Sequence, residues 1–146
     1  LLCVITALSS GVGVIDGVGF YIGLVVFIMG FALEVVSDIQ KTRFRKKLEN
    51  KKKFITSGLW AYSRHPNYLG ELILWCGVAI MSIESLDGLQ HIVLVSPLFV
   101  YVLLVYISGV RMLEGAGEEK WGTLPEYKEY IKRTPQLFIS LKKLIK

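Results

Sequence analysis

The sequence of 146 residues is poor in the side chains that hold small disulfide-linked or metal-binding domains together. It has two cysteines and two histidines. Cys3 and Cys76 both lie inside apolar runs, so they do not predict a disulfide framework, and we interpret them as small packing residues. At their separations, these cysteines and the two histidines form no recognisable ligand set, so we expect no metal site.

Other features are also missing. No basic residue precedes the first apolar run, so we expect no cleavable signal peptide there. We find no internal repeat, low-complexity tract or change of composition that would mark a second domain. Residues 1–146 are therefore expected to form a single membrane domain. Because the sequence opens on leucine within an apolar run, we interpret it as part of a longer protein.

Long apolar runs are abundant, since 53% of the residues are hydrophobic. Four runs approach the length of a membrane span: residues 1–15, 18–36, 69–83 and 92–110. The first and third are short and need tilt, or neighbouring residues, to cross a bilayer. The sequence predicts an all-α, polytopic membrane helix bundle of about four transmembrane helices, with a cytoplasmic basic loop and tail.

Charge is distributed unevenly along the chain, whose net charge is +5. Of the 17 basic residues, eight lie in residues 41–53 and seven in residues 120–146. Residues 84–90 carry two acids and no Lys or Arg. Since basic residues favour the cytoplasmic side of a membrane, both clusters are expected there, with residues 84–90 on the opposite side.

The segment AYSRHPNYLGE, residues 61–71, places several polar side chains at the start of the third apolar run. Polar groups at the mouth of a membrane helix need partners from protein, water or ligand, so this concentration marks a candidate site. Pro66 suits the first turn of a helix, which predicts a helix start at Pro66 or Asn67. The free backbone N–H groups of that turn, beside Arg64 and His65, form a plausible pocket for an anion.

Further polar residues stand at the ends of the second and fourth runs, and each of them taken alone could simply extend to the water boundary. Taken together, they favour a polar cavity shared by Asp38, Arg45, Asn67, Glu71 and Arg111. Asn67 and Glu71 are four residues apart and should share one helix face that points into the bundle.

Two polar segments flank this site. Residues 39–48 could continue the second span as a helix, with Gly58 as a break further on. The tail, residues 125–146, mixes aromatic and apolar residues with lysines, which suits a segment on the membrane surface or one folded back over the site. Attraction of these basic residues to anionic membrane lipid and a role in ligand binding both remain open.

Four blocks carry a family resemblance: SDIQKTRFR, GLWAYSRHPNYLGE, SGVRMLE and PEYKEYIKRTP. In this order and spacing, over residues 23–135, they resemble the C-terminal domain of the steroid 5α-reductase family, especially its uncharacterised microbial and protist branch. The RHPNY core alone is also similar to sterol reductases and to isoprenylcysteine carboxyl methyltransferases.

The resemblance implies an integral membrane reductase that transfers a hydride from NADPH to a carbon–carbon double bond of a steroid-like or isoprenoid-like lipid. It assigns Asp38 and Arg45 to the nucleotide half of the cofactor, and Asn67 and Glu71 to the nicotinamide and ribose half. It also places Arg111 at a phosphate, and Arg64, His65 and Tyr68 along the same cavity. The family's catalytic side chains lie in an N-terminal half that this chain does not contain, so no catalytic residue is assigned here.

Two alternatives stay open. One is a carboxyl methyltransferase of the isoprenylcysteine type that uses S-adenosylmethionine, although the double-acid tract usual there is interrupted between Glu114 and Glu118. The other is a non-catalytic subunit of a larger membrane assembly. We expect membrane lipid and a lipid-like substrate as partners and no nucleic acid. If the protein is eukaryotic, we expect it in the endoplasmic reticulum or another organelle membrane.

Overall fold

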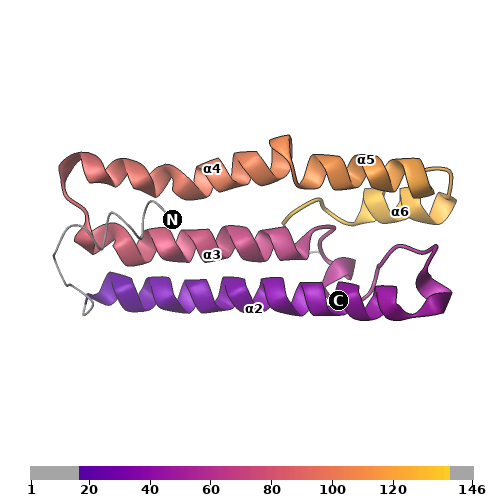
Figure 1. Ribbon diagram of the computed structural model, residues 1–146, viewed down its shortest axis with the longest axis horizontal. Helices are drawn as coiled ribbons and strands as arrows, with labels where there is room; N and C mark the ends of the chain where they lie inside the picture. Colours follow the sequence, from indigo (N-terminus) through magenta and orange to yellow (C-terminus); the bar gives the residue numbers. More distant parts are fainter. Residues whose placement is uncertain (1–16, 139–146) are drawn as a thin grey trace.

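The computed structural model describes residues 17–138, and these residues form helices with no strand among them. The α-helices are α2 (Val18–Lys46), α3 (Pro66–Ser82), α4 (Ser96–Val102), α5 (Val110–Trp121) and α6 (Pro125–Arg133). Figure 1 shows α3 lying between α2 on one side and the stretch from α4 to α5 on the other. The expected all-α membrane helix bundle is confirmed.

Three helical stretches in residues 17–138 are long and apolar enough to cross a membrane: Val18–Lys46, Pro66–Ser85 and Gly88–Trp121. They contain the second, third and fourth runs expected from the sequence. The first expected span, residues 1–15, lies outside the described residues. The expected extension of the second span is confirmed, since α2 continues to Lys46.

Glycines allow α2 and α3 to pack closely along their length. A Cβ atom on Gly70 would lie 2.5 Å from the backbone nitrogen of Glu34, and one on Gly77 would lie 2.5 Å from that of Phe27. Gly23 and Gly30 of α2 face this contact in the same way, with a Cβ on either lying 2.7 Å from a backbone carbonyl of α3. Small residues at such positions let helix backbones approach each other, which is a main source of helix association in membranes.

The fourth apolar run is not one regular helix. A 3-10 helix, Gly88–Val95, leads into α4, a π-helical turn follows at Leu103–Ile107, and the chain breaks at Ser108 and Gly109 before α5. At the break, the Ser108 backbone N–H and hydroxyl both donate to the Leu103 carbonyl, at 2.9 and 3.2 Å. A Cβ on Gly109 would lie 3.0 Å from the Tyr68 ring, so the glycine lets the backbone at this break pass close to the Tyr68 side chain.

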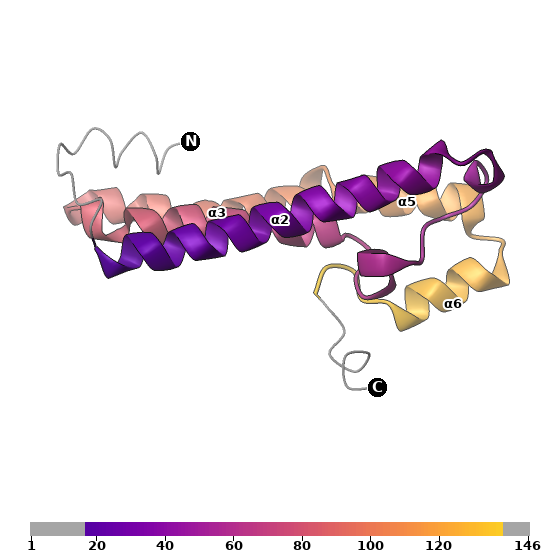
Figure 2. The same ribbon diagram turned by 90° about the horizontal axis from the view of Figure 1, so that it is seen from below.

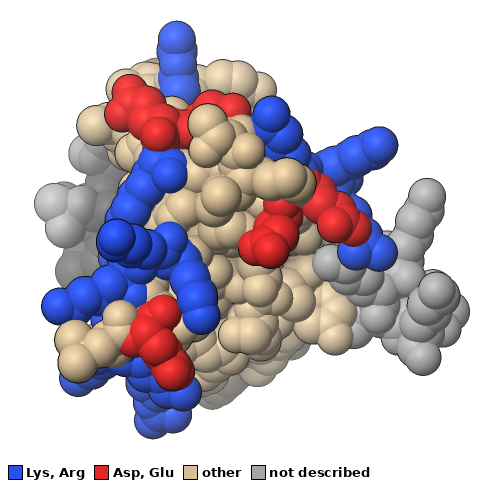
Figure 3. Space-filling view, turned by 90° about the vertical axis from the view of Figure 1, so that its right-hand side faces the viewer, with Lys and Arg blue, Asp and Glu red and all other residues tan. Residues whose placement is uncertain are grey.

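Both basic segments lie at one end of the bundle. The loop after α2 and helix α6 are at the right of Figure 1, and Figure 3 views this end, where Lys and Arg side chains gather. The acidic turn lies at the other end, where the Glu84 carboxylate accepts a hydrogen bond of 3.0 Å from the Gly19 N–H. Within residues 17–138, the basic loop and helix α6 therefore lie at the end opposite the acidic turn (Figure 1), while the membrane side of each end stays a prediction.

The chain after α5 folds back toward the bundle. Figure 2 shows α6 beside the loop that follows α2. An aromatic cluster joins these parts, because the Phe54 ring lies 5.0 Å from the Tyr127 ring and 5.8 Å from the Trp121 ring. Beyond α6, the Pro135 carbonyl accepts a hydrogen bond of 3.0 Å from the Arg64 N–H. For the described part of the tail, the alternative of folding back over the site is confirmed.

Candidate functional site

The loop that precedes α3 is shaped by a glycine and fastened to α2. Gly58 has φ +63°, a conformation that favours glycine, and a Cβ there would lie 2.5 Å from the Gln40 side-chain oxygen. The same oxygen accepts a hydrogen bond of 2.9 Å from the Leu59 N–H. The chain then reaches the start of α3 at Pro66, as the sequence predicted.

Trp60 anchors this loop from both sides. The residue is 4% exposed, and its indole N–H donates to the Ser37 carbonyl of α2 at 3.1 Å. Its own carbonyl accepts a hydrogen bond of 2.7 Å from the Tyr130 hydroxyl of α6. Burial raises the pKa of Tyr130, so this hydroxyl stays protonated and able to donate. The loop is thereby held between α2 and α6.

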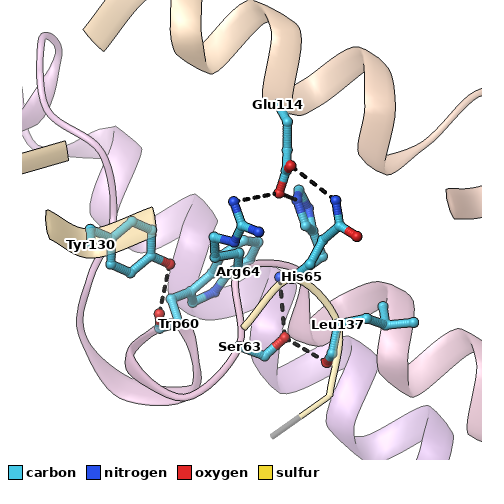
Figure 4. A network of polar contacts seen from close by, with 8 residues as sticks. Trp60, Ser63, Arg64, His65, Glu114, Tyr130 and Leu137 are labelled. Carbon is cyan, nitrogen blue, oxygen red and sulfur yellow. Dashed lines mark hydrogen bonds and ion pairs between the residues drawn. The ribbon is translucent and has the colours of Figure 1, made fainter. Parts of the chain in front are cut away.

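The centre of the site is the Glu114 carboxylate of α5 (Figure 4). One of its oxygens lies 2.9 Å from the Arg64 guanidinium and 3.2 Å from His65 Nε2. The other accepts a hydrogen bond of 2.9 Å from the Gln136 amide. Three separate parts of the chain, namely the loop before α3, helix α5 and the tail, meet at this one carboxylate.

Three buried polar atoms next to this network have no hydrogen-bond partner among the described residues: Arg64 Nε, His65 Nδ1 and Asn67 Oδ1. The His65 side chain is only 8% exposed and stacks on the Tyr68 ring, at 5.7 Å between centroids. Leaving a buried polar group unpaired costs about 1 to 3 kcal/mol. A cluster of such atoms within four residues therefore fits a polar ligand.

A cavity of about 130 Å³ opens beside Arg64 and His65. Its basic lining residues outnumber its one acid, Glu114, which is already paired with Arg64. The polar and aromatic lining residues are Lys41, Phe44, Arg45, Lys53, Phe54, Trp60, Arg64, His65, Glu114, Trp121, Tyr127 and Tyr130. The surplus of cations, with aromatic rings around it, suits an anion that carries flat rings.

This cavity adjoins a wider groove of about 580 Å³ between the loop and α6. Phe44, Lys53, Phe54 and Tyr130 line both spaces. Because pockets for small molecules usually measure about 300 to 1,000 Å³, the inner cavity has room for part of a dinucleotide and the groove for more.

Of the eight residues expected to bind the cofactor, the structure places some in the wall of this cavity and others outside it. Arg45, Arg64 and His65 line the cavity. Tyr68 contacts it through the His65 ring, and Tyr68 also lies within electrostatic reach of Asp38 and Glu71, beside Glu34. Asn67 and Glu71 are half-buried on α3, whereas Arg111 is exposed at the start of α5.

The sequence predicted one polar cavity shared by five residues: Asp38, Arg45, Asn67, Glu71 and Arg111. The cavity beside Arg64 and His65 differs from this prediction, because only Arg45 of the five lines it. Asp38 instead lines a separate groove on α2, together with Glu34 and Arg43. The binding roles that the resemblance implies for these residues stay predictions.

Sequence reasoning missed the partners that organise the site. Glu114 follows the fourth apolar run in the sequence, but its pairing with Arg64 and His65 joins residues 49 or 50 positions apart. Gln136 and the buried Ser63, whose hydroxyl donates to the Leu137 carbonyl at 2.8 Å, gave no signal at all. The one available hint was the unpaired charge of Glu114 at a membrane boundary.

Comparisons with known proteins bear on this site. A family model described as a protein of unknown function, DUF1295, matches residues 2–134. The probable O-methyltransferase ustE of Ustilaginoidea virens is 37% identical over 68 residues, covering 47% of this chain and 24% of that protein. Steroid 5-alpha-reductase DET2 of Arabidopsis thaliana is 40% identical over 65 residues, covering 43% of this chain and 24% of that protein.

A probable 7-dehydrocholesterol reductase of Acanthamoeba polyphaga mimivirus is 28% identical over 138 residues, covering 82% of this chain and 29% of that protein. The chain therefore spans roughly a quarter of the length of the curated relatives it matches. No solved structure matches it.

Proposed function

Because the chain belongs to the DUF1295 family, whose members resemble the C-terminal part of steroid 5α-reductases, we propose that it forms the cofactor-binding part of an NADPH-dependent reductase. The reductase acts on a carbon–carbon double bond of a steroid-like or isoprenoid-like lipid, within an organelle membrane such as the endoplasmic reticulum. The relatives named as steroid and sterol reductases support the reaction class.

The charge of the cavity is the observation that carries the choice of cofactor. Lys41, Arg45 and Lys53 line it without an acidic partner in the same cavity, because Arg64 and His65 already hold Glu114. NADPH brings several phosphates, which arginine and lysine bind strongly. S-adenosylmethionine has no phosphate and carries a positive sulfonium, which these cations would repel.

The residues fit the cofactor in kind as well as in charge. When bound, the dihydronicotinamide supplies a hydride to the lipid. Arg45 and Arg64 would bind phosphate oxygens, and the buried unpaired atoms of Arg64 and His65 would find partners on the ligand. The exposed apolar faces of α2 and α4 offer the lipid a route along the bundle, as at Val25, Ile28 and Phe99.

Titration calorimetry on the intact protein in lipid nanodiscs tests this proposal. We expect NADPH to bind and S-adenosylmethionine not to bind. Arg45→Gln should weaken NADPH binding about tenfold, equivalent to about 1.4 kcal/mol. Lys128→Gln removes one positive charge from an exposed position of α6 and should change the affinity less than about twofold.

The second candidate, a methyltransferase, is favoured by the similarity to a relative named as an O-methyltransferase. Binding of S-adenosylmethionine without NADPH would establish it in place of the reductase. Binding of neither compound to the intact protein would favour the third alternative, a non-catalytic subunit of a membrane assembly. Turnover of a 3-oxo-4-ene steroid or of 7-dehydrocholesterol with NADPH would identify the class of lipid.

A further inference from the structure

We propose that Lys41 recognises the 2′-phosphate that distinguishes NADPH from NADH, together with Arg45 one helical turn further along α2. This inference rests on the reductase function proposed above and adds a specificity residue, which the sequence did not assign. It starts from an excess of positive charge. Both side chains line the cavity beside Arg64 and His65, and the one carboxylate of that cavity, Glu114, already binds Arg64 and His65.

Lys41 and Arg45 place two positive charges on one face of α2. Residues four apart on a helix are neighbours, and like charges at this spacing repel each other. The two side chains lie within electrostatic reach of each other, and neither forms an ion pair with an acid within residues 17–138. Asp38 is also within electrostatic reach of Lys41, but it lines the separate groove on α2. An anion that binds both cations offsets their repulsion.

The Trp60 ring supports the Lys41 ammonium. Lys41 Nζ lies 4.8 Å from the centroid of this ring, which is within the range of a cation–π contact. The ring is itself fixed, because the indole N–H donates to the Ser37 carbonyl and the Trp60 carbonyl accepts from the Tyr130 hydroxyl, as Figure 4 shows for Tyr130. A lysine confined in this way loses less side-chain freedom when a ligand binds, which favours affinity.

The paired charges suit a phosphate monoester. Such a group carries a charge of about −1.5 to −2 near neutral pH, so a single monoester balances both cations. Each phosphate of the diphosphate bridge has two covalent neighbours and only one ionisable oxygen, so it balances one cation. The 2′-phosphate is the only monoester in NADPH, and it is also the only group that NADH lacks.

The size of the cavity favours a group at the end of a branch. Its volume of about 130 Å³ is below the roughly 300 Å³ at the lower end of pockets for whole small molecules, so it takes one part of the cofactor. The 2′-phosphate ends a branch, whereas the diphosphate bridge continues on both sides and needs the length of the adjoining groove of about 580 Å³. Phe44 and Phe54 line both spaces and offer aromatic rings to the adenosine part.

Titration calorimetry on the intact protein in lipid nanodiscs tests the proposal with two pairs of ligands. The first pair is NADPH and NADH. The second is adenosine 2′,5′-bisphosphate and ADP, which are isomers that differ in where one phosphate is attached. We expect the wild-type protein to bind NADPH and the 2′,5′-bisphosphate at least about tenfold more tightly than NADH and ADP, because charge-assisted hydrogen bonds to the 2′-phosphate are made only by the first of each pair.

Lys41→Met keeps most of the apolar stem and removes the charge. We expect NADPH affinity to fall about tenfold and NADH affinity to stay within about twofold, with the preference for the 2′,5′-bisphosphate over ADP falling in parallel. Lys41→Arg should keep both preferences within about threefold. Lys47→Gln removes an exposed positive charge from the same basic segment and should leave all four affinities within about twofold. Melting temperatures check that each variant folds, and Lys41→Gln replaces Lys41→Met if that variant does not.

Two kinds of failure are distinguishable. Equal affinities of the wild-type protein for NADPH and NADH, an equal loss of both affinities in Lys41→Met, or an unchanged preference for the 2′-phosphate in that variant would overturn the role of Lys41 while leaving a reductase that binds a nicotinamide dinucleotide. Wild-type protein that binds neither NADPH nor NADH would overturn the proposed function, and the role of Lys41 with it.

Discussion

The membrane-spanning part of the bundle and its basic end are held together by different kinds of contact. Between α2 and α3, glycines such as Gly70 bring two backbones together with no side chain between them. At the basic end, side chains such as Trp60 and Tyr130 bind the loops to the helices through hydrogen bonds to backbone carbonyls. The close contact between α2 and α3 leaves no space for a ligand, whereas the contacts at the basic end leave a cavity and unpaired polar atoms.

The contrast indicates where stability and function reside. A close helix pair has no room for a ligand, so it serves as a fixed support. The loop and tail leave their polar groups around an open space, which gives a ligand room to bind. Changes in the glycine contact should therefore damage the fold, and changes at the basic end should mainly affect the site.

Gly70→Leu should have the largest effect. The new side chain would start 2.5 Å from the Glu34 nitrogen, where no flexible group can move aside, so the helices must separate. We expect the free energy of unfolding to fall by about 3 kcal/mol. Thermal unfolding in detergent measures this, with Gly115→Leu as the control because nothing lies within 4 Å of a Cβ there. Equal stability of the two variants would mean that α2 and α3 do not pack as described.

Ser63→Ala should come next. The buried hydroxyl donates to the Leu137 carbonyl and accepts from the His65 N–H, so its removal leaves two buried groups unpaired. We expect a loss of about 2 kcal/mol, felt mainly where the tail docks. Limited proteolysis should release the tail faster than in the exposed control Ser57→Ala. An unchanged cleavage rate would show that the tail is held by other contacts.

Glu71→Gln tests whether α3 contributes to the site beyond the cavity around His65. The substitution keeps size and hydrogen bonding but removes the charge, and we expect NADPH affinity or turnover to fall about tenfold, near 1.4 kcal/mol, with the fold intact. Glu49→Gln, in the exposed loop after α2, is the control. Identical binding and activity in both variants would restrict the site to the cavity of Arg64 and His65.

Tyr130→Phe should have the smallest effect, since it removes one hydrogen bond of 2.7 Å to the Trp60 carbonyl. We expect a loss of about 1 kcal/mol in stability. Because burial raises the pKa of Tyr130, this contribution should be complete below the ordinary tyrosine value of about 10 and should be lost as the pH rises above it. Comparing melting temperatures near neutral and at high pH measures it, and Tyr21→Phe is an exposed control. If the stability contribution of the Tyr130 hydroxyl already fell with rising pH near neutral pH, this account would be contradicted.

The sequence predicts local features of the fold well. Pro66 starts α3 because its ring suits a first helical turn, and the polar run after residue 36 keeps its helical pattern to Lys46. The break at Ser108 and Gly109 could not be predicted, because the apolar residues before it continue without interruption. It depends on the Tyr68 ring, which belongs to another helix.

The site could be predicted only in part. The RHPNY segment marked its position, since polar residues at a membrane boundary require partners. The identity of those partners depends on contacts between Arg64, Glu114 and Gln136, which are distant in the sequence. No local pattern records that Glu114 faces the loop, or that the tail passes over Ser63.

The most direct measurement is a cryo-electron microscopy structure of the intact protein with NADP⁺. The account predicts cofactor density in the cavity lined by Arg45, Arg64 and His65, with a phosphate beside an arginine and a polar group of the ligand at His65 Nδ1. Density for NADP⁺ at another place in the protein, with none in this cavity, would contradict it.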